Sequence, residues 1–466
     1  MKRGEIIELE ITSPAFEGSA VGRVDNQVVF VPFALPGDRI RARITRKKRK
    51  FAEAVIEKIL SPSPDRTDPV CLHFGTCGGC RLQNAAYGRQ LEYKQAIVRG
   101  LMERIGGLTG IEVRPVIPSP RQYGYRNKME FSFGSRRWLT SDEIATGEKI
   151  SRDFALGLHI PKRFDRILDL EECHLQEPVS IKILRFVRKT ALDQGWDPYD
   201  VSDHTGYLRN LIIRLGINSG EVMVNLVTTS WDEERTAYLK EQLGEHFPEI
   251  TTLLNSINSG PNPTAIEKEI VLFGSGTLHD RIGSYEYRIA PFSFFQPNTL
   301  QAENLFKVIK SAASPNKEDT VYDLYCGLGA IGIFLSKEAG RVIGVESQSL
   351  SIELARKNAL EKGFDNCKFF ALDVIESLQK EFLSEHGSPD IVILDPPRAG
   401  LHPKAVSSLR DASPAKIVYT SCNPATQARD LALLSDDYEI SPIQPVDMFP
   451  QTWHIESVAT LHRRKV

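Results

Sequence analysis

The chain has 466 residues, of which 41% are hydrophobic, and a formal net charge of -2. This length predicts two to four domains, each with an ordinary hydrophobic core. The N-terminal residues lack the apolar region of a secretory signal and no uncharged apolar run reaches the length of a membrane span, so we expect a cytoplasmic protein without a membrane partner. Because 58 basic residues nearly balance 60 acidic ones, any affinity for polyanions must come from local clusters of charge.

Residues 1–62 are predicted to form a small β-barrel. Apolar and polar residues alternate in short runs, and Gly18, Gly22 and Pro36-Gly37 interrupt these runs as turn residues do. From Arg39 to Lys50 there are eight basic residues and no acidic one. Such a run is typical of a surface that binds nucleic-acid phosphates, although charged residues also protect the exposed edges of sheets. We expect the barrel to contact a nucleic acid.

Three cysteines in the next segment have the spacing of a metal centre. Cys71, Cys77 and Cys80 form a C-x5-C-x2-C pattern, in which two glycines allow a tight backbone turn. Seven cysteines in a chain without a secretory signal favour such ligation over disulfides. The candidates for a fourth ligand are Cys173, which we favour, and the histidines His73 and His174. The spacing predicts a metal centre without distinguishing zinc from an iron-sulfur cluster.

The middle of the chain mixes helical and strand patterns. Apolar residues recur at helical spacing from 86 to 105, and we interpret this amphipathic helix as part of the scaffold. Strand patterns and the helical patterns at 178–194 and 232–246 then predict an α+β domain. Aromatic and basic residues interleave at its start, which is typical of a surface that stacks bases and also of structural tyrosines beside solvated charges. These residues are Arg121, Tyr123, Tyr125, Arg126 and Lys128.

From Thr320 onward short apolar strands alternate with helices, which predicts a doubly wound, mostly parallel sheet. Gly327 and Gly329 follow the first strand and open the next helix, as in loops whose backbone N–H groups approach a ligand closely. Glu346 ends the second strand, where a carboxylate accepts both hydroxyls of a ribose. Because a third glycine is missing, this combination favours S-adenosylmethionine over a dinucleotide. Asp373 and Asp395 end later strands at the same edge of the sheet.

Cys422 lies at the end of another predicted strand. An apolar run precedes it and Pro424 stops the strand, so the thiol is displayed where strand becomes loop, a usual place for chemistry in open α/β sheets. A free cysteine is commonly just a small buried apolar residue. The polar strand end at Asp395 and the glycine-rich turn favour the catalytic interpretation, because all three belong to one edge of the predicted sheet.

These motifs give the sequence a resemblance to the bacterial RNA 5-methyluridine methyltransferases. Nearly all of the chain is covered, and the N-terminal barrel resembles that family's TRAM module. The matching motifs are, in order, Phe295-Gln296-Pro297-Asn298, Asp323 to Gly329, Glu346, Asp395-Pro396-Pro397-Arg398-x-Gly400, Ser421-Cys422-Asn423-Pro424 and His454-Ile455-Glu456-Ser457-Val458. One difference is Ala330, which stands where relatives often carry asparagine.

The resemblance implies a role for individual residues. Cys422 would be the nucleophile that adds to carbon 6 of uracil, and Glu456 would be the base that removes the proton from carbon 5. The site for S-adenosylmethionine and the target base would be lined by Gln296, Tyr325, Glu346, Asp373 and Asp395. The ligands of a [4Fe-4S] cluster would be Cys71, Cys77, Cys80 and Cys173.

The resemblance also implies three domains and an RNA substrate. The expected domains are the TRAM barrel at 1–62, a central α+β RNA-binding domain with the cluster at 63–82 and 116–284, and a Rossmann-like methyltransferase domain at 83–115 and 285–466. Retention of the barrel and cluster favours ribosomal RNA, the 23S molecule in particular, over transfer RNA, and we expect a monomer. The alternatives are an amino-methyltransferase, because Asp-Pro-Pro resembles the motif that holds an exocyclic amine, and a non-catalytic RNA-binding module. Cys422 and Glu456 are unexplained by either alternative.

Overall fold

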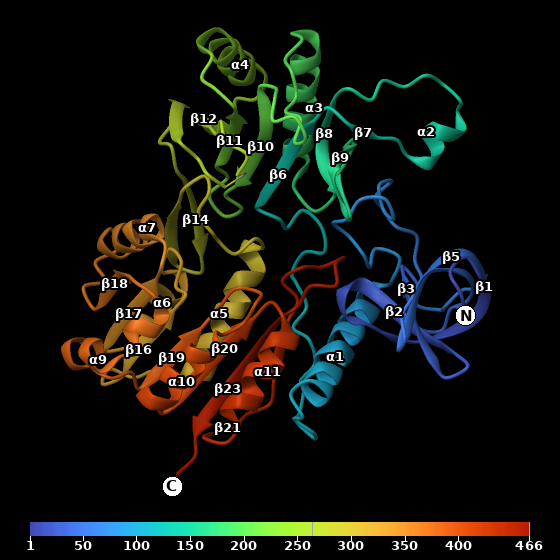
Figure 1. The fold of residues 1–466 in the computed structure, drawn as a ribbon. Coiled ribbons are helices and arrows are strands. Elements are labelled where there is room, and N and C mark those ends of the chain that lie inside the picture. Colours follow the sequence, from blue (N-terminus) through green and yellow to red (C-terminus); the bar gives the residue numbers. More distant parts are fainter. Residues whose placement is uncertain (263, 466) are drawn as a thin grey trace. The chain divides into compact units, whose positions relative to one another are not determined.

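The computed structural model describes residues 1–262 and 264–465, which divide into two compact units (Figure 1). The first unit comprises Met1–Pro69, Arg81–Pro120 and Gln301–Val466, and the second comprises Val70–Cys80 and Arg121–Leu300. The three domains predicted from the sequence have other boundaries than these two units, and they stay a prediction. Over the described chain, no helix combines the length and the apolar character that crossing a membrane requires.

The first unit begins with the predicted barrel. Its strands close in the order β1-β2-β3-β5-β4, in which β3 and β5 run parallel and the other neighbours run antiparallel. Alternate residues of these strands fill the interior, as Ile7, Leu9 and Ile11 do on β1. The prediction of a small β-barrel is therefore confirmed, and the barrel has five strands. The strand bounds are β1 Ile6–Pro14, β2 Ser19–Val24, β3 Gln27–Pro32, β4 Arg39–Lys47 and β5 Phe51–Ser61, with a short 3-10 helix at Phe16–Gly18.

The C-terminal part of the first unit is a doubly wound sheet in the order β18-β17-β16-β19-β20-β23-β21, with β22 paired to β23. The five strands β16 to β20 run parallel, whereas β23 is antiparallel to all of its neighbours. The parallel strands are nearly continuous apolar runs because helices flank both faces of such a sheet. The strand bounds are β16 Thr320–Leu324, β17 Arg341–Glu346, β18 Cys367–Ala371, β19 Ile391–Leu394, β20 Lys416–Ser421, β21 Tyr438–Ile440, β22 Gln444–Val446 and β23 Glu456–Arg463.

Helices connect the strands of this sheet, and the earlier helix α1 packs with them. Val98 and Met102 of α1 belong to the same buried apolar cluster as the parallel strands. Figure 1 shows α11 beside β23 and α1 beside α11. The bounds are α1 Tyr87–Arg104, α5 Thr299–Ala313, α6 Ala330–Leu335, α7 Ser349–Leu360, α8 Val374–Ser377, α9 Lys380–His386, α10 Pro403–Ala412 and α11 Pro424–Leu434.

The second unit is built on a mixed sheet in the order β13-β12-β11-β10-β6-β8-β9-β7, with a separate hairpin β14-β15. The bounds are β6 Lys128–Gly134, β7 Arg137–Trp138, β8 Ala155–Ile160, β9 Arg163–Asp169, β10 Leu208–Leu215, β11 Val222–Thr228, β12 Ile250–Ile257, β13 Lys268–Phe273, β14 Leu278–Ile282 and β15 Tyr285–Ile289. Its helices are α2 Ser141–Ala145, α3 Pro178–Asp193 and α4 Glu233–His246. The α3 and α4 bounds agree with the predicted helices to within one residue.

Candidate active site

Cys422 follows strand β20 directly and precedes helix α11. The side chain of Asn423 caps this helix by accepting a hydrogen bond from the N–H of Ala425 at 3.2 Å, and Pro424 is its first residue. A proline is favoured at this position because its missing N–H would have no helical partner anyway. The half-buried thiol of Cys422 is thus held at the junction of strand and helix, where the sequence predicted it.

The register between β20 and β23 brings Glu456 near Cys422. Ser421 and Ser457 are the last pair of this antiparallel ladder, and Cys422 and Glu456 are the next residues beyond it on the two chain segments. The two side chains are close enough for the charge of Glu456 to raise the pKa of the Cys422 thiol. The side chain of Glu456 is only 5% exposed, and its Oε2 is buried without a hydrogen-bond partner in the described chain. A lone buried carboxylate oxygen is costly, which is typical of a functional group.

Burial and neighbouring charges shift the pKa values of this pair. Burial raises the pKa of the Cys422 thiol to about 12, with smaller contributions in the same direction from Glu456 and Asp395. Burial also raises the pKa of Glu456 well above its ordinary value, and the nearby carboxylate of Asp395 adds to this rise. The guanidinium of Arg398 lowers both pKa values. Burial and the two carboxylates thus favour the protonated form of the thiol.

Asp395 and Arg398 belong to the loop that follows β19. This loop is joined to the loop after β20, since Nδ2 of Asn423 donates a hydrogen bond to the carbonyl of Arg398 at 2.9 Å. A second contact joins an Nη2 of Arg398 and Nδ1 of His454 at 3.5 Å. Burial raises the pKa of Asp395 to about 7. The two loops and the start of β23 thus present their polar groups together.

The turn after β16 forms the second part of the site. Asp323 is fully buried, and its Oδ2 accepts a hydrogen bond from the N–H of Gly332 at 2.8 Å. Its Oδ1 has no partner in the portion that the structure describes, and burial raises its pKa to about 7. Gly329 has a φ of 79°, and an added Cβ there would lie 2.7 Å from the ring of Phe369. Around Gly327 there is open space, so a ligand can approach this backbone closely.

The predicted cofactor residues of the first unit gather at this sheet edge. Tyr325 has a φ of 64°, and its pKa is raised to about 12 by burial and by Asp373, with Glu346 contributing. Glu346 accepts a hydrogen bond from the N–H of Gln348 at 3.1 Å, and exposed Asp373 caps α8 through the N–H of Ile375 at 2.7 Å. Gln296 is buried in the second unit, where its carbonyl accepts a hydrogen bond from Nδ2 of Asn127 at 2.8 Å.

Asp323 and Arg398 belong to the sequence motifs but were not predicted as site residues. Asp323 is an acidic residue inside an otherwise apolar strand, and this pattern was a usable signal. The closeness of Arg398 to Cys422 had no local signal, because it depends on which strands are neighbours in the sheet.

The four predicted ligand cysteines lie in the second unit and interact with one another. Burial raises the pKa of Cys71 to about 12, and Cys173 and Cys77 add to the rise. Burial raises the pKa of the Tyr123 hydroxyl, and the nearby Cys80 and Cys71 raise it further. The N–H of Gly79 points at Sγ of Cys77, 3.4 Å away. Among the described residues, however, no three His, Cys, Asp or Glu side chains are placed to hold a single metal ion.

Half of the basic run of the barrel, its four arginines on β4, is paired with acidic residues on neighbouring strands. Arg39 and Arg41 of β4 both contact Glu8 of β1, at 3.5 and 2.9 Å. Across β5, Arg43 contacts Glu57 at 2.8 Å and Arg46 contacts Glu53 at 3.2 Å. The sequence showed no acidic residue within the run, but the sheet supplies several beside it. The surface is less one-sided than the run suggested.

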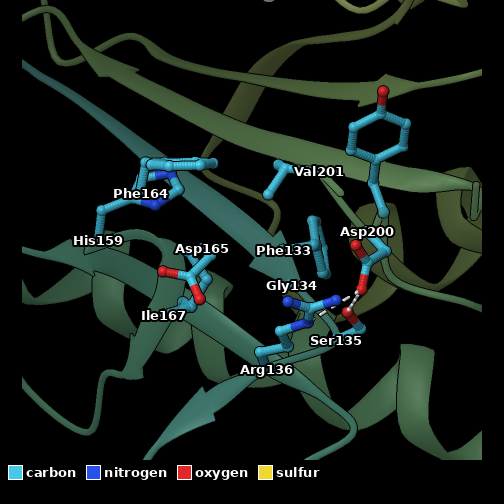
Figure 2. A pocket seen from close by; sticks show the side chains of 11 residues that line it. Phe133, Gly134, Ser135, Arg136, His159, Phe164, Asp165, Ile167, Asp200 and Val201 are labelled. Carbon is cyan, nitrogen blue, oxygen red and sulfur yellow. Dashed lines mark hydrogen bonds and ion pairs between the residues drawn. The ribbon is translucent and has the colours of Figure 1, made fainter. Parts of the chain in front are cut away.

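A shallow hollow in the second unit is lined by residues of β6, β8, β9 and the segment before β10 (Figure 2). In Figure 2 the guanidinium of Arg136 points toward Asp200, and these groups lie 3.4 Å apart. Ser135 also donates a hydrogen bond to Asp200. Because the arginine is paired in this way, the hollow offers little free positive charge to a phosphate.

The fold and the polar strand ends of the first unit define an α/β domain that binds a nucleotide-like cofactor at the carboxyl edge of its sheet. Residues 275–464 match the family model described as tRNA (Uracil-5-)-methyltransferase, and residues 1–56 match the TRAM domain.

Known relatives match almost the whole chain. A protein described as an uncharacterized RNA methyltransferase of Bacteroides thetaiotaomicron is 41% identical over 97% of this chain and 100% of its own length. One with a similar description from Chlorobaculum tepidum is 40% identical over 99% of this chain and 97% of its own. The crystal structure of Pyrococcus abyssi tRNA (uracil-54, C5)-methyltransferase in complex with S-adenosyl-L-homocysteine is 30% identical, covers 97% of this chain and 100% of that chain, and has a TM-score of 0.73.

The chain therefore belongs to the RNA uracil-5 methyltransferase family with an N-terminal TRAM domain. It is an S-adenosylmethionine-dependent RNA (uracil-C5)-methyltransferase, as the sequence motifs predicted. The amino-methyltransferase and the non-catalytic module are thereby set aside.

Proposed function

We propose that this enzyme forms 5-methyluridine in ribosomal RNA by way of a covalent bond between Cys422 and the target uracil. The observation that carries this mechanism is that Cys422 and the buried Glu456 lie just beyond the last pair of β20 and β23, close enough for Glu456 to raise the pKa of the thiol. A nucleophile and a base on opposite strands reach neighbouring atoms of one ring. This is what addition at carbon 6 and proton removal at carbon 5 require.

Each residue has one step in this mechanism. Cys422 gives up its proton to water, and its sulfur adds to carbon 6, so that the π electrons of the ring make carbon 5 nucleophilic. Carbon 5 then takes the methyl group. Glu456 removes the proton from carbon 5, the electrons of that C–H bond restore the double bond between carbons 5 and 6, and the C–S bond breaks to release the thiolate. Burial strengthens Glu456 as a base, because it raises the pKa of this carboxyl group.

The residues at the sheet edge fit S-adenosylmethionine, which supplies the methyl group when bound. The open backbone at Gly327 and the buried, unpartnered Oδ1 of Asp323 suit a small polar ligand at this turn. Glu346 is placed at the end of β17 to accept ribose hydroxyls. We assign Tyr325, Glu346, Asp373 and Asp395 to the site of cofactor and target base, and Gln296 of the second unit stays a prediction.

We further propose that Cys71, Cys77, Cys80 and Cys173 hold a [4Fe-4S] cluster. Two observations support it: Cys173 and Cys77 are near enough to Cys71 to raise its pKa, and the N–H of Gly79 points at Sγ of Cys77, as N–H groups commonly do toward sulfur ligands of clusters. A cluster is larger than one ion, so its ligands do not need the close grouping that a single zinc requires.

Ribosomal RNA is proposed as the substrate because the chain retains both the TRAM barrel and the four cysteines proposed to hold the cluster. Transfer RNA is the alternative, since the Pyrococcus enzyme that this chain resembles over its whole length acts on a tRNA. Incubating the enzyme with labelled methyl donor and either 23S RNA or bulk tRNA lacking 5-methyluridine decides between them. Label in tRNA alone would overturn the ribosomal assignment.

The covalent mechanism has its own test. Parent enzyme and Cys422→Ala are incubated with substrate RNA that carries 5-fluorouridine, whose fluorine a base cannot remove as a cation. We expect a complex that survives denaturing electrophoresis with the parent and none with Cys422→Ala. A surviving complex with Cys422→Ala would remove this cysteine as the nucleophile.

A further inference from the structure

Helix α1 carries a buried polar cluster that holds the segment leading to β23. Nζ of Lys94 lies 2.6 Å from Oδ1 of Asp447, and neither side chain has exposed surface. The hydroxyl of Tyr87 donates a hydrogen bond to Oδ2 of the same carboxylate at 2.9 Å. Both carboxylate oxygens of Asp447 are therefore held by α1. An ion pair without solvent contact holds both side chains firmly in place, because a displacement of either one would leave a charge buried and unpaired.

The same face of α1 also holds the backbone further along this segment. Gln90 accepts a hydrogen bond from the N–H of Gln451 at 3.0 Å, and its Nε2 donates one to Oε1 of Gln451 at 2.9 Å. Lys94 donates another to the carbonyl of Phe449 at 3.0 Å. Tyr87, Gln90 and Lys94 are spaced so that they project from one face of the helix. Together they fix the chain from Asp447 to Gln451.

The segment from Asp447 to Gln451 is connected to Glu456 at both of its ends. Asp447 follows Val446 of β22, and Val446 pairs with Glu456 itself. The N–H of Asp447 is also bonded to the carbonyl of Ile117 at 3.0 Å, which anchors β22 from its other side. Gln451, at the far end of the segment, lies only five residues before Glu456 and has a φ of 68°. A shift of Asp447 or Gln451 would therefore move Glu456 relative to β20 and Cys422.

We propose that Tyr87, Gln90 and Lys94 are positioning residues that hold Glu456 within reach of the carbon 5 proton. This inference rests on the proposed function, in which Glu456 is the base. Cys422 is positioned separately, by β20 and α11. Loosening the cluster should therefore slow the release of methylated RNA while leaving thiol addition and methyl transfer intact. A cluster that merely stabilises the fold would affect these steps together.

The test uses conservative variants of α1 with a tyrosine variant of the same helix as control. Tyr87→Phe removes the hydrogen bond to Asp447 and the one that the hydroxyl accepts from the N–H of Ser119. Gln90→Met removes the contacts with Gln451 and the hydrogen bonds to the carbonyls of Leu82 and Ala85, while keeping the size of the side chain. The control is Tyr93→Phe, because Tyr93 is on the same helix and also donates a hydrogen bond to a carboxylate, Oδ2 of Asp65 at 2.6 Å. In the described part of the chain Tyr93 forms no hydrogen bond with residues 447–451. Lys94 is left in place, since its removal would bury the charge of Asp447 without a partner.

Formation and decay of the methylated enzyme-RNA complex are followed by denaturing electrophoresis in a single turnover with labelled methyl donor. We expect Tyr87→Phe and Gln90→Met to slow decay about tenfold, as for a misplaced catalytic group, with formation at the parental rate. Tyr93→Phe should match the parent in both. Parental decay in both α1 variants, or formation and decay that fall together, would overturn the inference.

The Glu456→Ala variant separates this result from the proposed function. Its methylated complex should accumulate, because no base removes the proton. If it does accumulate while Tyr87→Phe and Gln90→Met release product normally, only the positioning role is wrong. If Glu456→Ala releases product at the parental rate, the role of Glu456 as base fails and the positioning role fails with it.

Discussion

Cys422 and Glu456 lie one position beyond Ser421 and Ser457, which are the last paired residues of two strands that run in opposite directions. Strand β23 lies between β20 and β21, so a residue from near the C-terminus enters the edge formed by the earlier parallel strands. The two groups therefore share a buried environment, which raises the pKa of each. Neither is ionised as readily as it would be in water. The pH dependence of the reaction should reflect this.

Two substitutions should shift the pH profile in opposite directions. Asp395→Asn removes a carboxylate that raises the pKa of Glu456, whereas Arg398→Gln removes a cation that lowers it. Since the base must be ionised, decay of the methylated complex should accelerate as the pH rises through the pKa of Glu456. The accelerating limb should move to lower pH in Asp395→Asn and to higher pH in Arg398→Gln. Single-turnover decay measured between pH 5.5 and about 9 checks this, and a limb that stays in place in both variants would contradict it.

Asp323 should make the protein without cofactor less stable as the pH rises. Its pKa is about 7 in the fold against an ordinary 3.8, so between these values the folded state holds a proton that the unfolded chain has lost. The free energy of unfolding should fall by up to about 1.4 kcal/mol per pH unit from this group, and stay level above its folded pKa. Asp323→Asn keeps an acceptor for the N–H of Gly332 and removes the titration. Urea unfolding from pH 5 to 8 should show a flatter profile for the variant, and equal slopes would refute the assignment.

The loop cations of the barrel should matter more for RNA binding than the paired arginines of β4. Lys48, Arg49 and Lys50 have no ion pair in the described chain, whereas Arg41 and Arg43 contact glutamates. Replacing the three loop cations by serine should lower the salt dependence of RNA binding by about 0.7 log units of slope for each lost phosphate contact. Arg41→Ser with Arg43→Ser should change the slope less. Filter binding across a salt series measures both, and the reverse order would show that RNA displaces the glutamates.

Protein purified without oxygen should contain iron and sulfide. Four thiolates at this spacing bind soft iron clusters, and the ligands come from two separate segments of the second unit, 71–80 and 173. Cys80→Ser should lose iron and unfold at lower temperature, because cluster binding contributes to folding. Metal analysis and a thermal melt check this. Stoichiometric zinc without iron would disprove the cluster assignment.

Local pattern in the sequence determined the barrel, the alternation of strands and helices, the glycine-rich turn and the display of Cys422 at a strand end. Each depends on residues near one another in the chain, where hydrophobic period, turn residues and proline act directly. The family followed from the same motifs, because their order along the chain is preserved.

Only the tertiary structure decided how distant residues meet. The antiparallel insertion of β23 brings Glu456 near Cys422, and glutamates of β1 and β5 pair with the arginines of β4. Likewise, the sequence identified 86–105 as an amphipathic helix, but not that its polar residues hold Asp447, more than 350 residues away. The pKa values of Asp323, Asp395 and Glu456 also depend on the tertiary structure. Strand pairing and burial arise from long-range packing, and no local period in the chain encodes which distant partner will be the neighbour.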